Sequence, residues 1–128
     1  MQIINKSIPE PKSQATLGVT ADGAITAAGL PVLVYLDADG WRASVEPVSN
    51  ATVLNGKALG ISTESADDEA VTSVVVAGKV AVATSAGTVG QVVTAITSAG
   101  SCTTQTFASA TANIYGYYSA AKEIVLVG

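Results

Sequence analysis

The sequence contains no histidine among its 128 residues. Histidine is the commonest general base and metal ligand and the usual activator of a serine or cysteine nucleophile, so its absence removes most catalytic arrangements. A glycine-rich phosphate loop, a paired-cysteine metal motif and a nucleophile elbow are also missing. An enzyme would have to act through the ten acidic side chains alone. We therefore expect a protein that is not an enzyme and that has no catalytic residues, no cofactor and no metal ion.

Charge is also scarce, because charged residues make up 12% of the chain against about a quarter in a typical soluble protein. The six cations are scattered and the net charge is -4, so we expect no basic face that binds nucleic acid. Apolar residues reach 48%, but no run approaches the roughly 20 residues of a membrane-spanning helix, so we expect no membrane partner. So few charges protect a surface poorly against association, and we expect neighbouring molecules to cover much of it.

Only one cysteine, Cys102, is present, so no disulfide can form within the chain. The first residues lack the cationic and apolar regions of a secretory signal. Both features favour folding in a reducing cytoplasm, with Cys102 as a small, half-buried strand residue rather than a reactive thiol.

The most apolar stretch is residues 71–83, VTSVVVAGKVAVA. Its β-branched valines disfavour helix and suit a packed, pleated surface, so they predict strands. Ala77-Gly78-Lys79 is the expected reversal between two strands of a hairpin, because glycine reaches positive φ without penalty. Three consecutive valines at 74–76 break the alternation of a half-exposed strand. They predict a strand covered on both faces, by a second sheet or by another subunit.

Short β-prone runs alternate with turn signals through the rest of the chain, which is typical of an all-β sandwich or barrel. Outside the central hairpin, the predicted strands are residues 24–27, 31–36, 41–45, 57–63, 92–97, 102–107, 114–118 and 123–127. We therefore predict an all-β fold, a compact sandwich or barrel of short antiparallel strands. Residues 18–128 are long enough for a single β domain with a modest core.

Residues 1–17 differ in composition from the rest of the chain. They contain Pro9 and Pro11 and show no alternating pattern. Proline donates no ladder hydrogen bond and restricts the residue before it to extended geometry, so these residues form an extended N-terminal arm or a frayed terminus. If they form an arm, the residues expected to contact a partner are Ile3, Ile4, Ile8, Pro9 and Pro11.

The sequence also contains a weak internal repeat. Residues 29–40 and 90–100 each consist of a glycine, an apolar strand and a small or acidic turn closed by glycine. Residues 58–62 and 71–78 have partners in residues 114–119 and 124–128 at a similar offset. These offsets are explained either by two related β units or by convergence on a common composition of glycines, turns and strands.

Two groups of acidic residues are candidate sites. Asp37 and Asp39 before Gly40 are similar to the start of a calcium loop, but the later ligands are missing, so a tight hairpin turn is the better interpretation. The acidic residues of the segment 64–69 are best explained as a solvated loop that protects sheet edges, although such a loop could also meet a basic patch on a partner.

Aromatic residues are few and concentrate near the C-terminus. Tyr115 and Tyr117 share one face of a predicted strand and Tyr118 takes the other. Because tyrosine combines a large contact area with a polar tip, these residues suit an interface, although they could instead close an open end of a barrel. Trp41, beside Arg42, is either a core residue or an interface anchor.

The segment 29–40 (GLPVLVYLDADG), with GKALGIS at 56–62, an acidic loop and VTSVVVAGKV at 71–80 after it, resembles the small head decoration proteins, or capsid cement proteins, of tailed bacteriophages. The likeness is good over residues 18–83 and looser elsewhere. The chain departs from the family pattern in the insertion at 44–55 and in its tyrosine-rich tail.

This resemblance implies a structural virion protein without catalysis, which binds the outer surface of an expanded capsid and stabilises it. It implies that the partners are the major capsid protein and two further copies of the chain in a homotrimer. The location would be the capsid exterior, after assembly in the host cytoplasm. We expect the N-terminal arm and one open end of the domain to bind the shell, and trimer formation to bury the valine and alanine faces.

A second hypothesis is a receptor- or glycan-binding β module of a phage tail or bacterial surface appendage. In that protein Trp41 and one of the three tyrosines would stack on a sugar, and the acidic loop would accept hydrogen bonds from hydroxyl groups. One tryptophan and scattered tyrosines make this hypothesis the weaker of the two.

Overall fold

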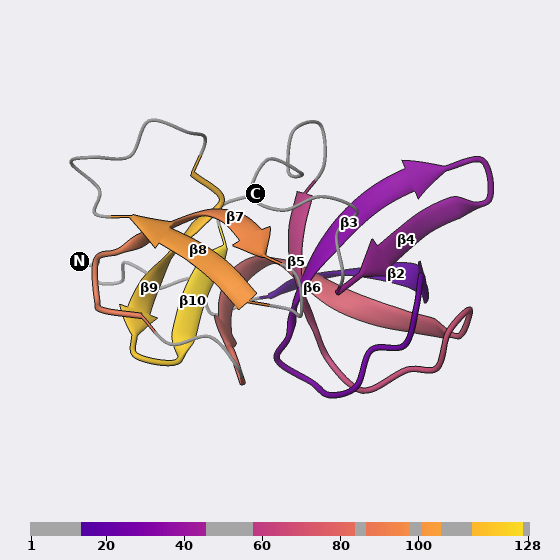
Figure 1. Ribbon diagram of the computed structural model, residues 1–128, viewed down its shortest axis with the longest axis horizontal. Coiled ribbons are helices and arrows are strands. Elements are labelled where there is room, and N and C mark those ends of the chain that lie inside the picture. The colour runs from indigo at the N-terminus through magenta and orange to yellow at the C-terminus, as the bar shows by residue number, and fades with distance from the viewer. Residues whose placement is uncertain (1–13, 46–57, 84–86, 98–100, 106–113, 127–128) are drawn as a thin grey trace, which may run out of the picture.

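The computed structural model describes residues 14–45, 58–83, 87–97, 101–105 and 114–126. These residues form nine β-strands and no helix (Figure 1), as the sequence predicts. The strands are β2 (Ala15–Ala21), β3 (Pro31–Asp37), β4 (Gly40–Ser44), β5 (Ala58–Ser62), β6 (Val71–Ala81), β7 (Val92–Thr97), β8 (Ser101–Gln105), β9 (Gly116–Ala120) and β10 (Glu123–Leu126).

The first five strands form a closed barrel in the order β2-β4-β3-β5-β6, because β2 also pairs with β6. All neighbours in it are antiparallel except β2 and β4, which run parallel. Small side chains fill its interior, as a five-stranded barrel requires. They are Val19, Val32, Val34, Ala43 and Val74. The predicted all-β barrel is therefore confirmed, with one parallel pair among the antiparallel ones.

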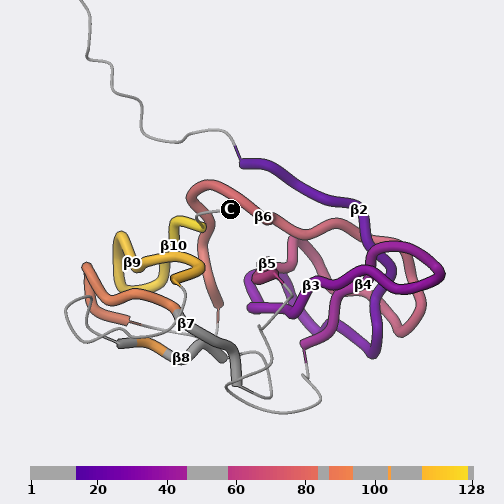
Figure 2. The backbone as a smooth tube through the Cα atoms, turned by 90° about the horizontal axis from the view of Figure 1, so that it is seen from above, coloured from indigo at the N-terminus to yellow at the C-terminus, as the bar shows by residue number. Residues whose placement is uncertain are grey.

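Strand β6 is continuous from Val71 to Ala81, so the predicted reversal at residues 77–79 is wrong. Gly78 does take a positive φ of 97°, but this conformation serves a bend beside an irregularity in the β2–β6 register. Residues 71–77 of β6 pair within the barrel, and residues 78–81 pair with β10. Figure 2 shows β6 passing from the barrel to a second group of strands.

In the middle of β6, both faces are covered by the chain itself. Val74 is 0% exposed and points into the barrel, whereas Val75 is 2% exposed and belongs to a different cluster outside the barrel. The prediction of a strand buried on both sides is confirmed. No second subunit is needed to bury these valines, so the expectation that a trimer buries the valine faces is wrong for them.

The second group contains the end of β6 and the strands β10, β9, β7 and β8, in that order. This order repeats the order β2, β6, β5, β3 and β4 of the barrel. Each strand therefore has a counterpart: residues 78–81 of β6 correspond to β2, β7 to β3, β8 to β4, β9 to β5, and β10 to residues 71–75 of β6.

The pairing registers of the two groups also agree. Val32 on β3 lies opposite Gly60 on β5. In the second group Val93 on β7 lies opposite Gly116 on β9. A Cβ atom added to either glycine would come within 2.8 Å of a neighbouring atom, so both positions require glycine.

The backbone hydrogen bonds at the entry to these strands match as well. The Gly29 amide donates to the carbonyl of Ser62 at 2.8 Å, and the Gly90 amide donates to the carbonyl of Tyr118 at 3.0 Å. Gly29 and Gly90 both have a positive φ. Equivalent strand order, register and hydrogen bonds confirm the predicted internal repeat and make convergence of composition the poorer explanation.

The barrel covers one side of the second group. The outer side chains of the barrel strands β3, β5 and β6 form one buried cluster with residues of the second group. Its members are Leu33, Leu59, Ile61 and Val75 from the barrel, and Val82, Val93, Tyr118, Ile124 and Leu126 from later in the chain. At the edge of this contact, the Ala83 amide donates to the Gly29 carbonyl at 2.9 Å.

The predicted boundary of the N-terminal arm falls inside β2. Ala15, Thr16 and Leu17 pair with β6, so the last three residues assigned to the arm belong to the barrel. The arm residues Ile3, Ile4, Ile8, Pro9 and Pro11 lie outside the described residues.

Candidate contact surface at the barrel end

The β3–β4 hairpin ends in the turn that the sequence predicts. The Asp39 amide donates to Asp37 Oδ1 at 2.8 Å, and Gly40 has a φ of 117°. An aspartate that accepts a hydrogen bond from a backbone amide two residues on is a common way to stabilise a tight turn. This short turn lets β3 and β4 extend beyond the barrel as a hairpin (Figure 1).

Two large apolar side chains are exposed near this turn. Leu36 and Trp41 are register partners on β3 and β4, and they are 62% and 43% exposed. Each lies two residues from a buried barrel residue, Val34 or Ala43, and so continues the inward-facing side of its strand past the end of the core. We call residues 36–41 the hairpin tip.

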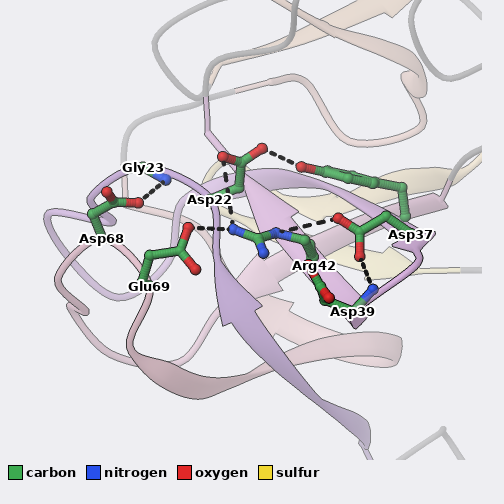
Figure 3. Close-up of polar contacts among 8 residues, drawn as sticks. Asp22, Gly23, Asp37, Asp39, Arg42, Asp68 and Glu69 are labelled. Carbon is green, nitrogen blue, oxygen red and sulfur yellow. Dashed lines mark hydrogen bonds and ion pairs between the residues drawn. The ribbon is translucent and has the colours of Figure 1, made fainter.

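The opposite face of the hairpin carries a polar cluster centred on Arg42. Its guanidinium binds Glu69 at 2.5 Å and lies 3.7 Å from Asp37 and 4.0 Å from Asp22. The Tyr35 hydroxyl donates to Asp22 on the same face. Figure 3 shows the guanidinium between these carboxylates, which come from β3 and from the loops after β2 and before β6.

The positive charge of Arg42 is therefore paired with carboxylates of its own chain. Its side chain is only 11% exposed, and the hydrogen bond to Glu69 is the main cause that raises its pKa above the ordinary value. The sequence predicted Arg42 at an interface together with its neighbour Trp41. Since adjacent strand residues point to opposite faces, Trp41 and Arg42 separate. Trp41 alone lies on the apolar side of the tip.

Tyr35 also has a structural role. Burial, together with the hydrogen bond and the charge of Asp22, raises its pKa to about 12. The protonated phenol acts as the donor in this hydrogen bond, and the raised pKa keeps it protonated to a higher pH than an exposed tyrosine. Together with Arg42 it fastens the acidic loop and the loop after β2 to the base of the hairpin.

Three exposed carboxylates, of Asp22, Asp68 and Glu69, have oxygens within 4.8 Å of one another. Asp68 Oδ1 accepts a hydrogen bond from the Gly23 amide at 2.9 Å, and Glu69 binds Arg42. These partners account for the acidic group without a cation, so we assign no metal site. The loop expected to be merely solvated is in part tied to the barrel.

The three C-terminal tyrosines do not form one surface. Tyr118 is 1% exposed and lies in the core, so its predicted place at an interface is wrong. Tyr115 packs against the same core, and Tyr117 is 40% exposed. These residues belong to β9 or precede it, in the group of strands opposite the β3–β4 hairpin (Figure 1), so they do not gather with Trp41.

Leu36 is the functional candidate that sequence reasoning missed. Its signal was present, because a turn at Asp37-Ala38-Asp39-Gly40 pairs Leu36 with Trp41 across the hairpin. Cys102 lies in β8 as expected, opposite Ile96 of β7.

No family model, no curated protein and no solved structure matches the chain. In the part of the chain that the structure describes, no helix is long and apolar enough to cross a membrane.

Proposed function

We propose that this protein is a structural virion protein that binds the outer surface of an expanded phage capsid and stabilises it. The major capsid protein is its partner, and it acts as a homotrimer on the capsid exterior. The sequence resemblance to capsid decoration proteins motivates this proposal, and one structural observation supports it most: Leu36 and Trp41 are exposed together at the hairpin tip.

The exposure of these two residues needs an explanation because neither belongs to the buried core of the described residues. Three buried clusters account for the interior of the barrel, its end and the junction with the second group, and neither residue is a member. Tryptophan is enriched among the residues that contribute most to protein interfaces, where it contacts an apolar pocket of the partner. The hairpin projects this pair away from the barrel, so the tip can enter a depression in a larger surface.

Binding stabilises a capsid only if the protein prefers the expanded lattice over its precursor. A small contact at each site is sufficient, because many sites act on one shell. An exposed apolar pair fits this kind of binding, because an apolar contact itself depends little on salt.

The direct test is co-sedimentation of the purified protein with expanded capsids that lack it. Leu36→Ser/Trp41→Ser should weaken binding about 30-fold or more, because anchoring aromatic residues typically contribute about 2 kcal/mol or more. The matched control is Val89→Ser, which alters an apolar side chain that is 67% exposed in the second group. Absence of co-sedimentation for the unaltered protein would remove the proposal. Equal binding by both variants would remove the role of the hairpin tip.

The homotrimer is tested separately by native mass measurement, which should give three times the 12.7 kDa of one chain. Since the chain itself buries Val74 and Val75, the trimer contact must use other surfaces. A monomer at micromolar concentration would contradict this part of the proposal.

A glycan-binding module is the second candidate, favoured by the exposure of Trp41 at a hairpin turn that also carries Asp37 and Asp39. An exposed aromatic ring next to hydrogen-bond acceptors can hold a sugar. Binding to a glycan array that Trp41→Ala abolishes, together with no binding to capsids, would favour this candidate over the first.

A further inference from the structure

A cavity of about 420 Å³ lies beside the end of β6. Its lining includes the consecutive residues Val80 and Ala81 at the end of the strand and Val82 and Ala83 after it. Neighbouring side chains of a strand point to opposite faces. Val80 and Ala81 therefore both line the cavity only because it reaches the edge of the strand, where their backbone is accessible.

The pairing with β10 determines where the backbone groups at this edge point. The Val82 amide donates to the Lys122 carbonyl at 3.0 Å, and Ala81 lies opposite Glu123 in the register. In an antiparallel ladder, hydrogen-bonded pairs alternate with pairs that are not hydrogen-bonded. Ala81 and Glu123 therefore form a pair of the second kind, and the N–H and C=O groups of Ala81 point away from β10.

The described residues occupy this edge on both sides of Ala81 but not at Ala81 itself. On one side the Gln14 side-chain amide donates to the Lys79 carbonyl at 2.8 Å. On the other side the Ala83 amide donates to the Gly29 carbonyl at 2.9 Å. Ala81 is exposed between them, and no described residue bonds to its outward N–H or C=O group. Such an open position on a strand edge is a template for pairing with a further extended chain.

The side chains around the open position are mostly small and apolar. The hydroxyl groups of Ser62 and Thr63, which also line the cavity, already bond to backbone carbonyls, so the cavity suits an apolar side chain. A positive charge lies close by, because the Lys122 ammonium donates to the carbonyl of the lining residue Ala83 at 3.2 Å. The cavity therefore offers a backbone donor and acceptor, an apolar space and a cation within a few residues of one strand.

We propose that this cavity binds an extended acidic peptide segment of another polypeptide, in which an apolar β-branched residue has an acidic neighbour. The main chain of the peptide pairs with Ala81, its apolar side chain fills the cavity, and its carboxylate binds Lys122. In this mode of recognition, main-chain hydrogen bonds supply affinity and side-chain pockets supply specificity. A fatty acid has the apolar part and the charge, but it cannot pair with both backbone groups of Ala81. The inference does not depend on capsid binding.

The test is a nuclear magnetic resonance titration of the full chain with a blocked peptide, glutamate-valine-threonine-valine-glutamate. An acidic residue at each end places a carboxylate near Lys122 in either strand direction. The amide signal of Ala81 should shift and its hydrogen exchange should slow. The matched control peptide is N-methylated at its three middle residues, which keeps the side chains but removes the donors, and it should bind about tenfold more weakly. Equal binding by the control, binding of octanoate but not of the peptide, or an Ala81 amide that is already protected without peptide would overturn the proposal.

The role of Lys122 is tested by a double-mutant cycle. Replacing both glutamates of the peptide by glutamine should weaken binding about two- to fivefold at low salt, as expected for an exposed ion pair. Lys122→Gln should cause the same loss for the glutamate peptide and none for the glutamine peptide. Circular dichroism checks that the variant keeps the fold. If Lys122→Gln weakens both peptides alike, or weakens neither, the carboxylate does not bind at this lysine and the proposed acidic specificity is wrong.

Discussion

The contact between the barrel and the second group can be tested by adding a single methyl group at Gly29. Its φ is +81°, and an added Cβ would lie 2.9 Å from the Ala83 amide nitrogen and 3.1 Å from Ala83 Cβ. Neither atom is the flexible end of a side chain, so the backbone has to move. A positive φ costs a residue other than glycine about 1–3 kcal/mol, and overpacking typically costs about 1–3 kcal/mol more. We expect Gly29→Ala to lower the free energy of unfolding by about 2–6 kcal/mol.

The internal repeat supplies a matched control. Gly90 is the counterpart of Gly29, with a φ of +93°, but an added Cβ would meet nothing within 4 Å. Gly90→Ala should therefore cost only the backbone part, about 1–3 kcal/mol. Gly18→Ala adds a methyl group in open space without the positive φ, and should change stability by about 0.5 kcal/mol or less.

Urea unfolding monitored by far-ultraviolet circular dichroism gives the free energy of unfolding of all three variants. An unchanged slope m shows that the variants expose the same surface area on unfolding as the unaltered protein. The diagnostic quantity is the difference between Gly29→Ala and Gly90→Ala, which reports the contact with Ala83 after the cost of φ is removed. If Gly29→Ala is no less stable than Gly90→Ala, the barrel and the second group do not pack as described.

Three single contacts give further expected outcomes. Tyr35 has a folded-state pKa of about 12 against about 10 in the unfolded chain. Its stabilising contribution is therefore complete below pH 10 and is lost as the pH rises from 10 to 12. In Tyr35→Phe, the free energy of unfolding measured in urea should change less with pH over this range. Arg42→Gln leaves three carboxylates without their shared cation, so the melting temperature should fall, and the deficit should shrink as NaCl rises from about 0.05 to 1 M; a deficit independent of salt would contradict this. Gly87→Ala would place a Cβ 2.6 Å from the Tyr118 ring and should cost about 1–3 kcal/mol, a loss that should largely disappear when Tyr118→Ala is the background.

Features set by neighbouring residues could be predicted from the sequence. The turn at residues 37–40 arises from the preference of aspartate and glycine for tight turns, and the structure has it. The repeat was visible because glycines recur at positions where strands pair closely, such as Gly60 and Gly116. The all-β fold likewise arises from β-branched residues between regular turn signals.

Features set by distant partners could not be predicted. Gly78 has the positive φ that a hairpin turn needs, but β10 pairs with residues 78–81, so the strand bends and continues. The partner of Arg42 lies 27 residues away at Glu69, and no local pattern indicates that pair. For Tyr118, alternation along β9 separates it from Tyr117 but does not say which of the two faces inward.

The scarcity of charged residues led us to expect that neighbouring molecules cover the valine and alanine faces. The structure points to a different surface. Val74 and Val75 are covered within one chain, the first inside the barrel and the second where the second group packs against its outside, whereas Val71 at the start of β6 is 83% exposed. What remains exposed and apolar among the described residues is concentrated in single side chains, of which Leu36 and Trp41 are paired on one projecting hairpin. A protein that has buried its sheets without help has no folding reason to expose its one tryptophan. The proposed capsid contact therefore uses the hairpin tip, and we propose that a contact of only two side chains would gain its affinity from many copies bound to one lattice.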